Sequence, residues 1–580
     1  MNTSVDPRKN VSFAIVGSGG MGAITAGSIL LEAAGKAGLH GLLNRSVGPQ
    51  IRGGEAAALV RLSTQPAFCM SKEFDILVAL DWKNADRFIN AMPVAEGGLV
   101  IADPAAGDPP RVLIESNCTI VECPIGEMAK AIKGGRENMI AVGLVAELTG
   151  LPLEQIMTVV TAKLNRKGQE AIDIGRTCID SGIAAAAGFH AAFPLTPKSE
   201  PNAKRWLITG NEAVGLGALR GGVRFAAAYP ITPATEVLEY LAPNLASTGG
   251  ALLQAEDELA SINMIIGASF GGRASITATS GPGLSLMMES LGLAAASETP
   301  IVVVDVMRVG PSTGIATQSE QSDLNIAVYG FHGDAPHVVI APLSVSDCLF
   351  TGQWSIHIAE TLQTPVIVLS DQSIGQSRVL IDRPEDVTFP TKRKPYEDTG
   401  EGYNRYAITA DGVSPMSIPG QVGGQYTADG LTHAISGQPS SSHSDQIEQM
   451  EKRTNKIESF DYSTHWGISE GDGDSDVVIL TWGSLTGAAR EAIVTLEENG
   501  ISARLVSLRQ ISPFPEQALT KALEGAKRIL FVEQNQTGQF YRHIRSHMDL
   551  PFEVRQLNRA GPSIIAPNEI VTQVLDWNSK

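Results

Sequence analysis

The chain has 580 residues, 43% of them hydrophobic, which is enough for three or four domains with large buried cores. Its formal net charge of -18 argues against nucleic acid as a partner, because a surface that follows phosphates needs clustered Lys and Arg. The five cysteines are scattered and contain no C-x-x-C pair, so we expect free thiols in a reducing compartment and no iron–sulfur ligand set, which needs about four thiolates at short spacings.

The N-terminal run from Val11 to Leu31 is uncharged and follows two basic residues, a pattern that imitates an export signal or a membrane span. Glycines at positions 17, 19, 20 and 22 lie in its middle, where a bilayer helix would carry bulky apolar side chains. A strand, a glycine turn and a helix explain the run better. We therefore expect a cytoplasmic protein that does not associate with membranes.

The turn Gly17–Gly22 opens an Ala-rich helix, so its backbone N–H groups could hold a phosphate or pyrophosphate. A tight connection without a ligand is the alternative, because this motif alone is weakly specific. A nicotinamide cofactor would also need an acidic residue about twenty residues later, where the chain instead offers Arg45 and Arg52 among glycines. That composition favours an anionic ligand or a partner surface.

Strand and helix patterns continue along the N-terminal third and predict a first α/β domain over residues 1–193, followed by a linker over 194–204. The apolar runs that continue the pattern are Ile76–Asp81, Gly98–Asp103, Cys118–Pro124 and Asn138–Leu148.

The second predicted domain, residues 205–371, begins with a strand near Trp206 and contains the segment Tyr229-Pro230-Ile231-Thr232-Pro233. Its prolines disfavour helix in the residues before them and would hold the Thr232 hydroxyl in a fixed direction. Thr232 could also cap a helix that starts at Pro233. A capping threonine can still face a ligand.

The stretch Leu252–Gly314 places polar groups after successive apolar runs, which is how open α/β sheets build ligand sites at their strand ends. Two acidic residues stand where one run becomes helical, a glycine turn follows the next, and an arginine follows a third. These residues are Glu256, Glu258, Ser280, Gly281 and Arg308.

Residues 372–474 are rich in Lys, Pro, Gly, Tyr, Ser and Asp and are too numerous for a simple connector. We expect an irregular arm that covers a neighbouring surface and contains a polar helix near 446–457; a mobile linker is the alternative. In residues 475–580, short strands alternate with helices, which predicts a small parallel sheet with right-handed crossovers.

Four motifs in order resemble the α subunit of the 2-oxoacid:ferredoxin oxidoreductases: Tyr229–Pro233, Gln254–Leu259, Thr279–Gly283 and Arg308–Gly314. The glycine turn resembles the family's γ domain, and residues 475–580 resemble its transketolase-C-terminal-like domain. The resemblance implies a multidomain α/β fold in which residues 205–371 form a doubly wound, pyrimidine-binding domain of the thiamine-diphosphate type.

Members of this family use thiamine diphosphate to convert a 2-oxoacid and coenzyme A to an acyl-CoA, carbon dioxide and reduced ferredoxin. The fused γ–α order resembles the 2-oxoglutarate enzymes most, which implies succinyl-CoA as product; 2-oxoisovalerate and pyruvate are alternative substrates. A nicotinamide or flavin oxidoreductase that uses the N-terminal glycine turn is a second hypothesis, and a non-catalytic scaffold is a third.

Thiamine diphosphate becomes a nucleophile when a buried carboxyl group hydrogen-bonds its aminopyrimidine ring, a role that the resemblance implies for Glu256 or Glu258. Residues two apart do not share a helix face. Glu258 is preferred, because a small, apolar helix start follows it and its nine-residue step to Gly267 resembles the family's. Glu256 could serve a neighbouring backbone or a subunit interface, and acids at a helix N-terminus are also favoured by its dipole.

The other site residues follow from the same resemblance. Arg308 could bind the 2-oxoacid carboxylate through two hydrogen bonds, with a surface salt bridge as the alternative. Thr232 could donate to that carboxylate or to the keto oxygen. Ser312 and Thr313 are expected in the same pocket, and Arg52 is a candidate for a distal carboxylate. The remaining expected cofactor contacts are Tyr229, Pro230, Ile231, Ser280 and Gly281.

Half of the family's machinery is missing from the sequence. Thiamine enzymes hold Mg²⁺ and the diphosphate with Gly-Asp-Gly and a later pair of asparagines, but here Gly471–Gly473 has no Asn-Asn after it. We therefore expect no metal site on this chain and a partner that holds Mg²⁺ and the diphosphate and removes the electrons. The resemblance implies that this partner is a β subunit with a [4Fe–4S] cluster, in an (αβ)₂ assembly that reduces ferredoxin.

Overall fold

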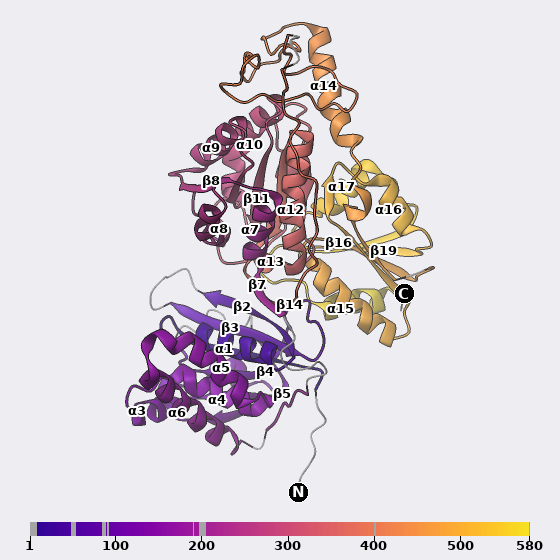
Figure 1. Cartoon of the computed structure of the whole chain (residues 1–580). Coiled ribbons are helices and arrows are strands. Elements are labelled where there is room, and N and C mark those ends of the chain that lie inside the picture. Colours follow the sequence, from indigo (N-terminus) through magenta and orange to yellow (C-terminus); the bar gives the residue numbers. More distant parts are fainter. Residues whose placement is uncertain are drawn as a thin grey trace. The chain divides into compact units, whose positions relative to one another are not determined.

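The computed structural model of the chain describes residues 8–47, 54–83, 89, 92–189, 191–196, 205–398, 402–471 and 473–578 (Figure 1). The chain forms two compact units. The first comprises Met1–Ile208 and Gln376–Pro384, and the second comprises Thr209–Gly375 and Glu385–Lys580.

The first unit is built on an eight-stranded sheet with the order β6-β5-β4-β1-β3-β2-β14-β7. Its strands are β1 (Asn10–Ser18), β2 (His40–Val47), β3 (Glu55–Ser63), β4 (Phe74–Ala79), β5 (Val94–Ala102), β6 (Thr119–Glu122), β7 (Arg205–Thr209) and β14 (Arg378–Asp382). Its helices are α1 (Ala23–Lys36), α2 (Arg111–Ile114), α3 (Ile125–Ala131), α4 (Glu137–Thr149), α5 (Leu153–Leu164) and α6 (Gln169–Ala186), with 3₁₀ turns at Pro104–Ala106 and Asn165–Lys167.

Consecutive apolar residues in β1 reflect a sheet that is covered on both faces. Phe13 and Ile15 belong to one hydrophobic core, whereas Ala14 and Val16 belong to another. The expected strand, glycine turn and helix are confirmed: β1 ends at Ser18, and α1 follows with Gly22 at its N-cap in the left-handed conformation.

The run 138–148, expected only as part of the alternating pattern, forms helix α4, in which eleven of thirteen residues are buried. Two strands differ from the expected domain organisation. Strand β7 was expected to open the second domain, and β14 was expected within the arm. Both lie at one edge of the first unit's sheet, where β14 pairs antiparallel with β2.

The main sheet of the second unit has the order β18-β12-β13-β11-β10-β8-β9, and its members run parallel apart from β18. Its strands are β8 (Phe225–Ala228), β9 (Ala251–Gln254), β10 (Ser275–Thr279), β11 (Ile301–Met307), β12 (Val338–Ile340), β13 (Pro365–Asp371) and β18 (Gln510–Ser512). The helices are α7 (Gly210–Gly221), α8 (Thr235–Ser247), α9 (Glu258–Phe270), α10 (Gly281–Ala296), α11 (Leu324–Tyr329), α12 (Val345–Leu362) and α13 (Gln372–Gln376). This is the doubly wound sheet that the sequence predicts.

The C-terminal part of the second unit forms a five-stranded sheet with the order β15-β17-β16-β19-β20. Its strands are β15 (Gly467–Glu470), β16 (Val477–Trp482), β17 (Ala503–Leu508), β19 (Arg528–Glu533) and β20 (Glu553–Asn558). Its helices are α15 (Leu485–Glu498), α16 (Glu516–Leu523), α17 (Gln539–His547) and α18 (Pro567–Asn578), with a 3₁₀ turn at Ser463–Trp466. The predicted parallel alternation is confirmed, whereas the antiparallel edge strand β15 was not predicted.

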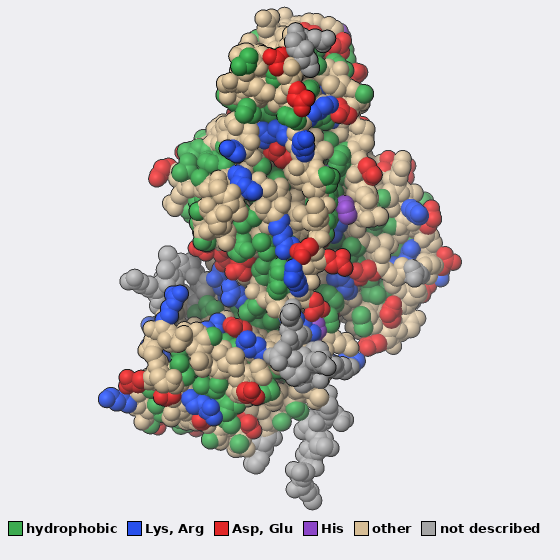
Figure 2. All heavy atoms as spheres, viewed as in Figure 1, with side chains coloured by type: hydrophobic (Ala, Val, Ile, Leu, Met, Phe, Trp, Pro, Cys, Tyr) green, Lys and Arg blue, Asp and Glu red, His purple; other side chains and the backbone are tan. Residues whose placement is uncertain are grey.

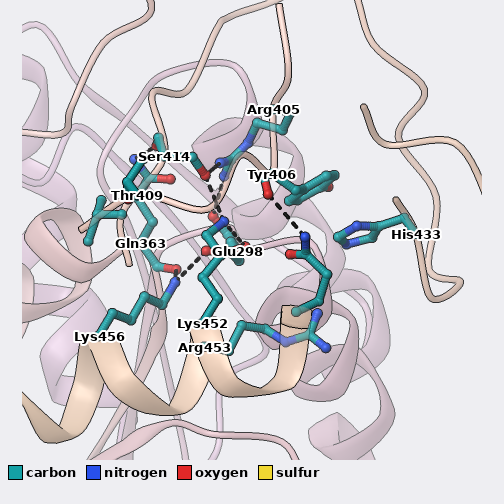
Figure 3. Close-up of polar contacts among 12 residues, drawn as sticks. Glu298, Gln363, Arg405, Tyr406, Thr409, Ser414, His433, Lys452, Arg453 and Lys456 are labelled. Atoms are coloured by element: carbon teal, nitrogen blue, oxygen red, sulfur yellow. Dashed lines mark hydrogen bonds and ion pairs between the residues drawn. The ribbon is translucent and has the colours of Figure 1, made fainter. Parts of the chain in front are cut away.

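The arm predicted over residues 372–474 is held to the main sheet's helices by a buried cluster of charges around Glu298, just after the end of α10 (Figure 3). Lys452 and Lys456 lie one turn apart on α14 (His443–Glu458), and each Nζ lies 2.7 Å from a Glu298 carboxylate oxygen. Arg405 donates to the Glu298 carbonyl at 2.8 Å. Burial alone would raise the pKa of Glu298, but Lys456, Lys452 and Arg405 outweigh it and hold that pKa well below its usual value. These contacts distinguish the arm from a mobile linker.

Within the described part of the chain, no helix combines the length and the apolar character that crossing a bilayer requires.

The Glu298 cluster makes a prediction about stability. Glu298→Ala leaves two buried lysines without a counter-charge, which should lower the stability of the second unit by about 3–5 kcal/mol. Urea unfolding followed by tryptophan fluorescence measures this change, because Trp354 is buried in α12. Glu289→Ala is the matched control on the exposed face of α10 and should cost less than about 0.5 kcal/mol. Equal effects of the two substitutions would contradict the role of the cluster.

Candidate active site

Four neighbouring strands of the main sheet, in the order β11-β10-β8-β9, end at one edge of the sheet because all four run parallel. The segments that leave this edge carry the four sequence motifs: 229–233 after β8, 255–258 after β9, 280–283 after β10 and 308–314 after β11. The carboxyl edge of a parallel sheet is where such folds bind ligands.

Glu258 is the first residue of α9, and only 7% of its surface is exposed, whereas Glu256 is exposed. The capping role at this helix belongs to Asp257, whose carboxylate accepts from the Ala260 N–H at 2.6 Å. Within the described part of the chain, the Glu258 carboxylate receives no hydrogen bond. Glu258 therefore does not cap the helix, and its buried carboxylate remains available for a ligand.

The Glu258 side chain lies directly against the first turn of α10. A Cβ atom at Gly283 would come within 2.7 Å of Glu258 Oε1 and 2.0 Å of Thr279 Oγ1, both far below contact distance. Only glycine therefore fits at this position while Glu258 keeps its place.

The other side of the same helical turn faces a second carboxylate. A Cβ atom at Gly281 would come within 2.6 Å of Asp323 Oδ2. Ser280 precedes the helix and is fully buried, yet its hydroxyl has no hydrogen-bond partner among the described residues. An unpaired buried hydroxyl is costly, so the Ser280 hydroxyl is a candidate hydrogen-bonding group for a bound ligand.

Arg308 and Thr232 meet at this edge of the sheet. Arg308 is 7% exposed and donates from Nη1 to the Thr232 carbonyl oxygen at 2.7 Å, so the alternative of a surface salt bridge is wrong. Its Nε–H is buried and finds no partner among the described residues. Burial lowers the pKa of Arg308, and the nearby Asp323 carboxylate opposes that shift.

The alternative role of Thr232 as a helix cap is wrong. Helix α8 begins at Thr235, and its N-cap is Ala234 without a side-chain hydrogen bond. The Thr232 side chain is exposed, so its hydroxyl is free to face a ligand while its carbonyl holds Arg308. The neighbouring residues are partly open: Tyr229 is exposed, and Pro230 and Ile231 are half-buried.

The turn after β11 is fastened by Glu320. One carboxylate oxygen accepts from Gly310 N–H at 3.2 Å, and the other accepts from Gly561 N–H at 3.0 Å in the C-terminal part of the unit. Ser312 and Thr313 lie on the exposed tip of this turn. Their expected place in the pocket stays a prediction, since neither side chain contacts Arg308 or Glu258 among the described residues.

The N-terminal glycine turn borders a cavity of about 370 Å³ in the first unit. Its basic lining residues are Lys130, Lys133 and Arg136, beside Gly20 and Met21 of the turn. This charge is consistent with the expected anionic ligand. Arg52, the candidate for a distal carboxylate, lies outside the described residues.

Several residues at this edge were not predicted as site residues: Gly283, Asp305, Glu320 and Asp323. Asp305 could have been found from the sequence, because it is the one acidic residue in the otherwise apolar strand Ile301–Met307. Acidic residues are almost never fully buried unless they are paired. Asp323 and Glu320 follow an irregular loop, so no periodicity places them near Arg308.

Three family models match successive parts of the chain. Residues 216–453 match "Pyruvate flavodoxin/ferredoxin oxidoreductase, thiamine diP-bdg", residues 12–185 match "Pyruvate ferredoxin/flavodoxin oxidoreductase", and residues 475–570 match "Pyruvate:ferredoxin oxidoreductase core domain II". All three descriptions belong to one group of enzymes.

Known relatives extend over nearly the whole chain. The 2-oxoacid:ferredoxin oxidoreductase subunit alpha of Sulfolobus sp is 30% identical to this chain, over 91% of the length of each protein. The 2-oxoglutarate synthase subunit KorA of Methanothermobacter marburgensis is 34% identical, over 64% of this chain and 99% of the KorA chain. The solved structure of 2-oxoglutarate:ferredoxin oxidoreductase from Magnetococcus marinus, with 2-oxoglutarate, coenzyme A and succinyl-CoA bound, is 36% identical with a TM-score of 0.92. The structural match covers 98% of this chain and 99% of the Magnetococcus chain.

The contact between α10 and Glu258 makes a second prediction. Gly283→Ala must displace Glu258 or Thr279, which should destabilise the second unit by about 1–3 kcal/mol. Gly292→Ala, later in the same helix, places its Cβ where no described atom lies within 4 Å and should be neutral or stabilising by up to about 1 kcal/mol. Urea unfolding of the two purified variants measures the difference, and a stable Gly283→Ala protein would show that the close approach is wrong.

Proposed function

The chain belongs to the family of 2-oxoacid:ferredoxin oxidoreductase α subunits, and from this membership we propose that it acts on 2-oxoglutarate. The reaction converts 2-oxoglutarate and coenzyme A to succinyl-CoA and carbon dioxide and transfers two electrons to ferredoxin. The observation that carries this proposal is the buried, unshared carboxylate of Glu258 at the sheet edge that also holds Arg308 and Thr232. Similarity to the Magnetococcus enzyme over 98% of the chain supports 2-oxoglutarate as the substrate.

The residues at this edge fit the aminopyrimidine end of thiamine diphosphate. Glu258 is buried and is relieved of capping by Asp257. Gly283 lets the Glu258 carboxylate lie directly against the first turn of α10, and the Ser280 hydroxyl is buried without a partner among the described residues. When bound, thiamine diphosphate supplies a carbon nucleophile for the keto carbon and accepts the electron pair released with carbon dioxide.

This chain's own residues then have distinct tasks. Glu258 holds a proton at the aminopyrimidine ring nitrogen and so favours the form of the ring that acts as a base. Arg308 binds the carboxylate of the 2-oxoacid through N–H groups that Thr232 does not occupy. The Thr232 hydroxyl donates to the carboxylate or to the keto oxygen. Burial of Glu258 and Arg308 keeps water from competing for these hydrogen bonds.

The diphosphate, Mg²⁺ and the electron path are assigned to a β partner that carries a [4Fe–4S] cluster. The five cysteines of this chain lie apart in sequence, and Cys123, Cys178 and Cys348 are buried. Within the described part of the chain, no three His, Cys, Asp or Glu side chains form a metal-ligating group. The two chains together make an (αβ)₂ assembly that delivers electrons to ferredoxin.

The outer face of α9 and α10 is the surface that we assign to this partner. Helices that are apolar on all sides are normally covered on all sides, yet Leu259 and Leu286 are about half exposed. Gly267 and Gly292 face outward, since a Cβ atom at either position would meet no described atom within 4 Å, and such glycines let another backbone approach closely. Figure 2 shows hydrophobic side chains gathered where α9 and β8 lie in Figure 1.

Substitution of the two glutamates tests the proposed function. In the complex of this chain with its β partner, Glu258→Gln should lower 2-oxoglutarate-dependent reduction of a viologen dye by about 10²–10⁴-fold, because the amide cannot exchange the proton. Glu256→Gln should stay within about twofold, since that side chain is exposed. Full activity of Glu258→Gln would contradict the proposal and favour a scaffold role. A panel with pyruvate and 2-oxoisovalerate tests the choice of substrate.

The assigned partner face makes a separate prediction. Leu286→Arg places a charge on the α9 and α10 face and should abolish co-purification of the β partner, because an unpaired charge buried at an interface is strongly unfavourable. Val494→Arg is the control on α15, where the side chain is similarly exposed, and should leave the complex intact. Retention of the partner by Leu286→Arg would show that it binds elsewhere.

A further inference from the structure

The side chain of Gln321 occupies the position at which the C-terminal sheet would bind a ligand. The chain continues from β16 to β17 on one side and later returns to β19 on the other, so the switch point lies between the carboxyl ends of β16 and β19. Gln321 is fully buried there. Its Nε2 donates to the carbonyl oxygen of Trp482, the last residue of β16, at 2.9 Å, and its Oε1 accepts from the Gln534 N–H, just after β19, at 3.0 Å.

The backbone of Gln321 is bound to the same strand ends. Its N–H donates to the Gln534 carbonyl oxygen at 2.8 Å, and its carbonyl oxygen accepts from Asn535 Nδ2 at 3.2 Å. A Cβ atom at Gly483 would come within 2.7 Å of Gln321 Nε2, so the turn after β16 lies directly against this side chain. The switch point of the C-terminal sheet therefore holds a segment of the chain itself.

Glu320, the preceding residue, connects the same sheet to the turn that begins at Arg308. Glu320 is 5% exposed, and its two carboxylate oxygens accept separately from the Gly310 N–H at 3.2 Å and the Gly561 N–H at 3.0 Å. Gly561 lies in the loop after β20, and a Cβ atom there would come within 2.7 Å of Val309 Cγ2. The C-terminal part of the unit thus reaches both residues that follow Arg308, one through Glu320 and one by direct contact.

The turn after β11 is also closed by its own backbone. The Val309 N–H donates to the Gln318 carbonyl oxygen at 3.0 Å, and the Val309 carbonyl oxygen accepts from the Ile315 N–H at 3.0 Å. Because the turn is closed in this way, a displacement of Glu320 is passed to the backbone beside Arg308.

We propose that Glu320 and Gln321 are positioning residues, through which the C-terminal sheet holds Arg308 in the orientation that binds the carboxylate of the 2-oxoacid. Their role rests on the proposed function of Arg308 and gives the C-terminal sheet a task in substrate binding. Arg308 Nη1 is already bound to the Thr232 carbonyl oxygen, so the remaining N–H groups must be aimed at the substrate by the backbone. That backbone is fixed by β11 before Arg308 and by the tethered turn after it, and small displacements of such a group are costly.

Glu320→Gln tests the bridge with almost no change in size. An amide has a single acceptor oxygen, so it can accept from only one of Gly310 and Gly561, and its NH₂ group faces the N–H of the other. In the complete enzyme, the KM for 2-oxoglutarate should rise by about tenfold. Both kcat and the affinity for thiamine diphosphate should stay within about threefold, because Glu258 is not touched.

A double substitution shows whether Glu320 acts through Arg308. Arg308→Ala should itself raise the KM for 2-oxoglutarate by about a hundredfold. Addition of Glu320→Gln to Arg308→Ala should raise the KM no further, because the positioned group is gone. A further tenfold rise in the double variant would overturn the proposal, since Glu320 would then act on substrate binding by another route.

Gly561→Ala tests the connection from the C-terminal side and decides the question if Glu320→Gln gives no soluble complex. Its methyl group would press on Val309, and the KM for 2-oxoglutarate should rise by at least about threefold. Asp347→Asn is the matched control, because Asp347 pairs with Arg509 at 2.6 Å and so ties the same two sheets together beside β12, which β13 separates from β11. It should lower the melting temperature of the complex and leave the KM within about twofold.

Two further results would overturn the proposal: an unchanged KM in either Glu320→Gln or Gly561→Ala, or an equal rise in Asp347→Asn, which would show a general effect of lost stability. Failure of the proposed function looks different. The unsubstituted complex would then not turn over 2-oxoglutarate, or Arg308→Ala would leave its KM unchanged.

Discussion

The first turn of α10 separates two buried carboxyl groups, and the chemistry of the site depends on that separation. Glu258 lies on one side, against Gly283, and Asp323 lies on the other, against Gly281. Any side chain at either glycine would push one carboxyl group from its place. Because Asp323 lies on the far side of the turn, Glu258 keeps a carboxylate that receives no hydrogen bond from the described residues. Its proposed role at the cofactor depends on that unshared carboxylate.

The sequence predicted much of this edge because its motifs are local. A turn with two glycines after an apolar run, an acid at a helix start and an arginine after a strand each follow from short spacings, and parallel strand order then brings them together. The preference for Glu258 over Glu256 agrees with the observed burial, although its role at the cofactor stays a prediction. Asp323 could not be predicted in the same way, because its position depends on the path of an irregular loop.

Elements that the sequence left unassigned or placed elsewhere have a common physical cause. Helix α4 is buried on nearly every side, so its hydropathy lacks the period that identifies a helix. Strand β14 joins the first unit through antiparallel pairing with β2, a contact between residues more than three hundred positions apart, and no local pattern encodes such pairing. The lysines of α14 look like a solvated face in the sequence, yet they bury their charges on Glu298. Long-range contacts, in each case, override a local pattern.

We infer that this chain provides one half of a catalytic site and that a β partner provides the other. The most direct measurement is 2-oxoglutarate-dependent viologen reduction by this chain purified alone, supplied with thiamine diphosphate, Mg²⁺ and coenzyme A, and then by the same sample after addition of the separately purified β subunit. We expect no turnover by the chain alone and full turnover once the β subunit is added. Dye reduction by the chain alone would show that this chain holds a complete catalytic site.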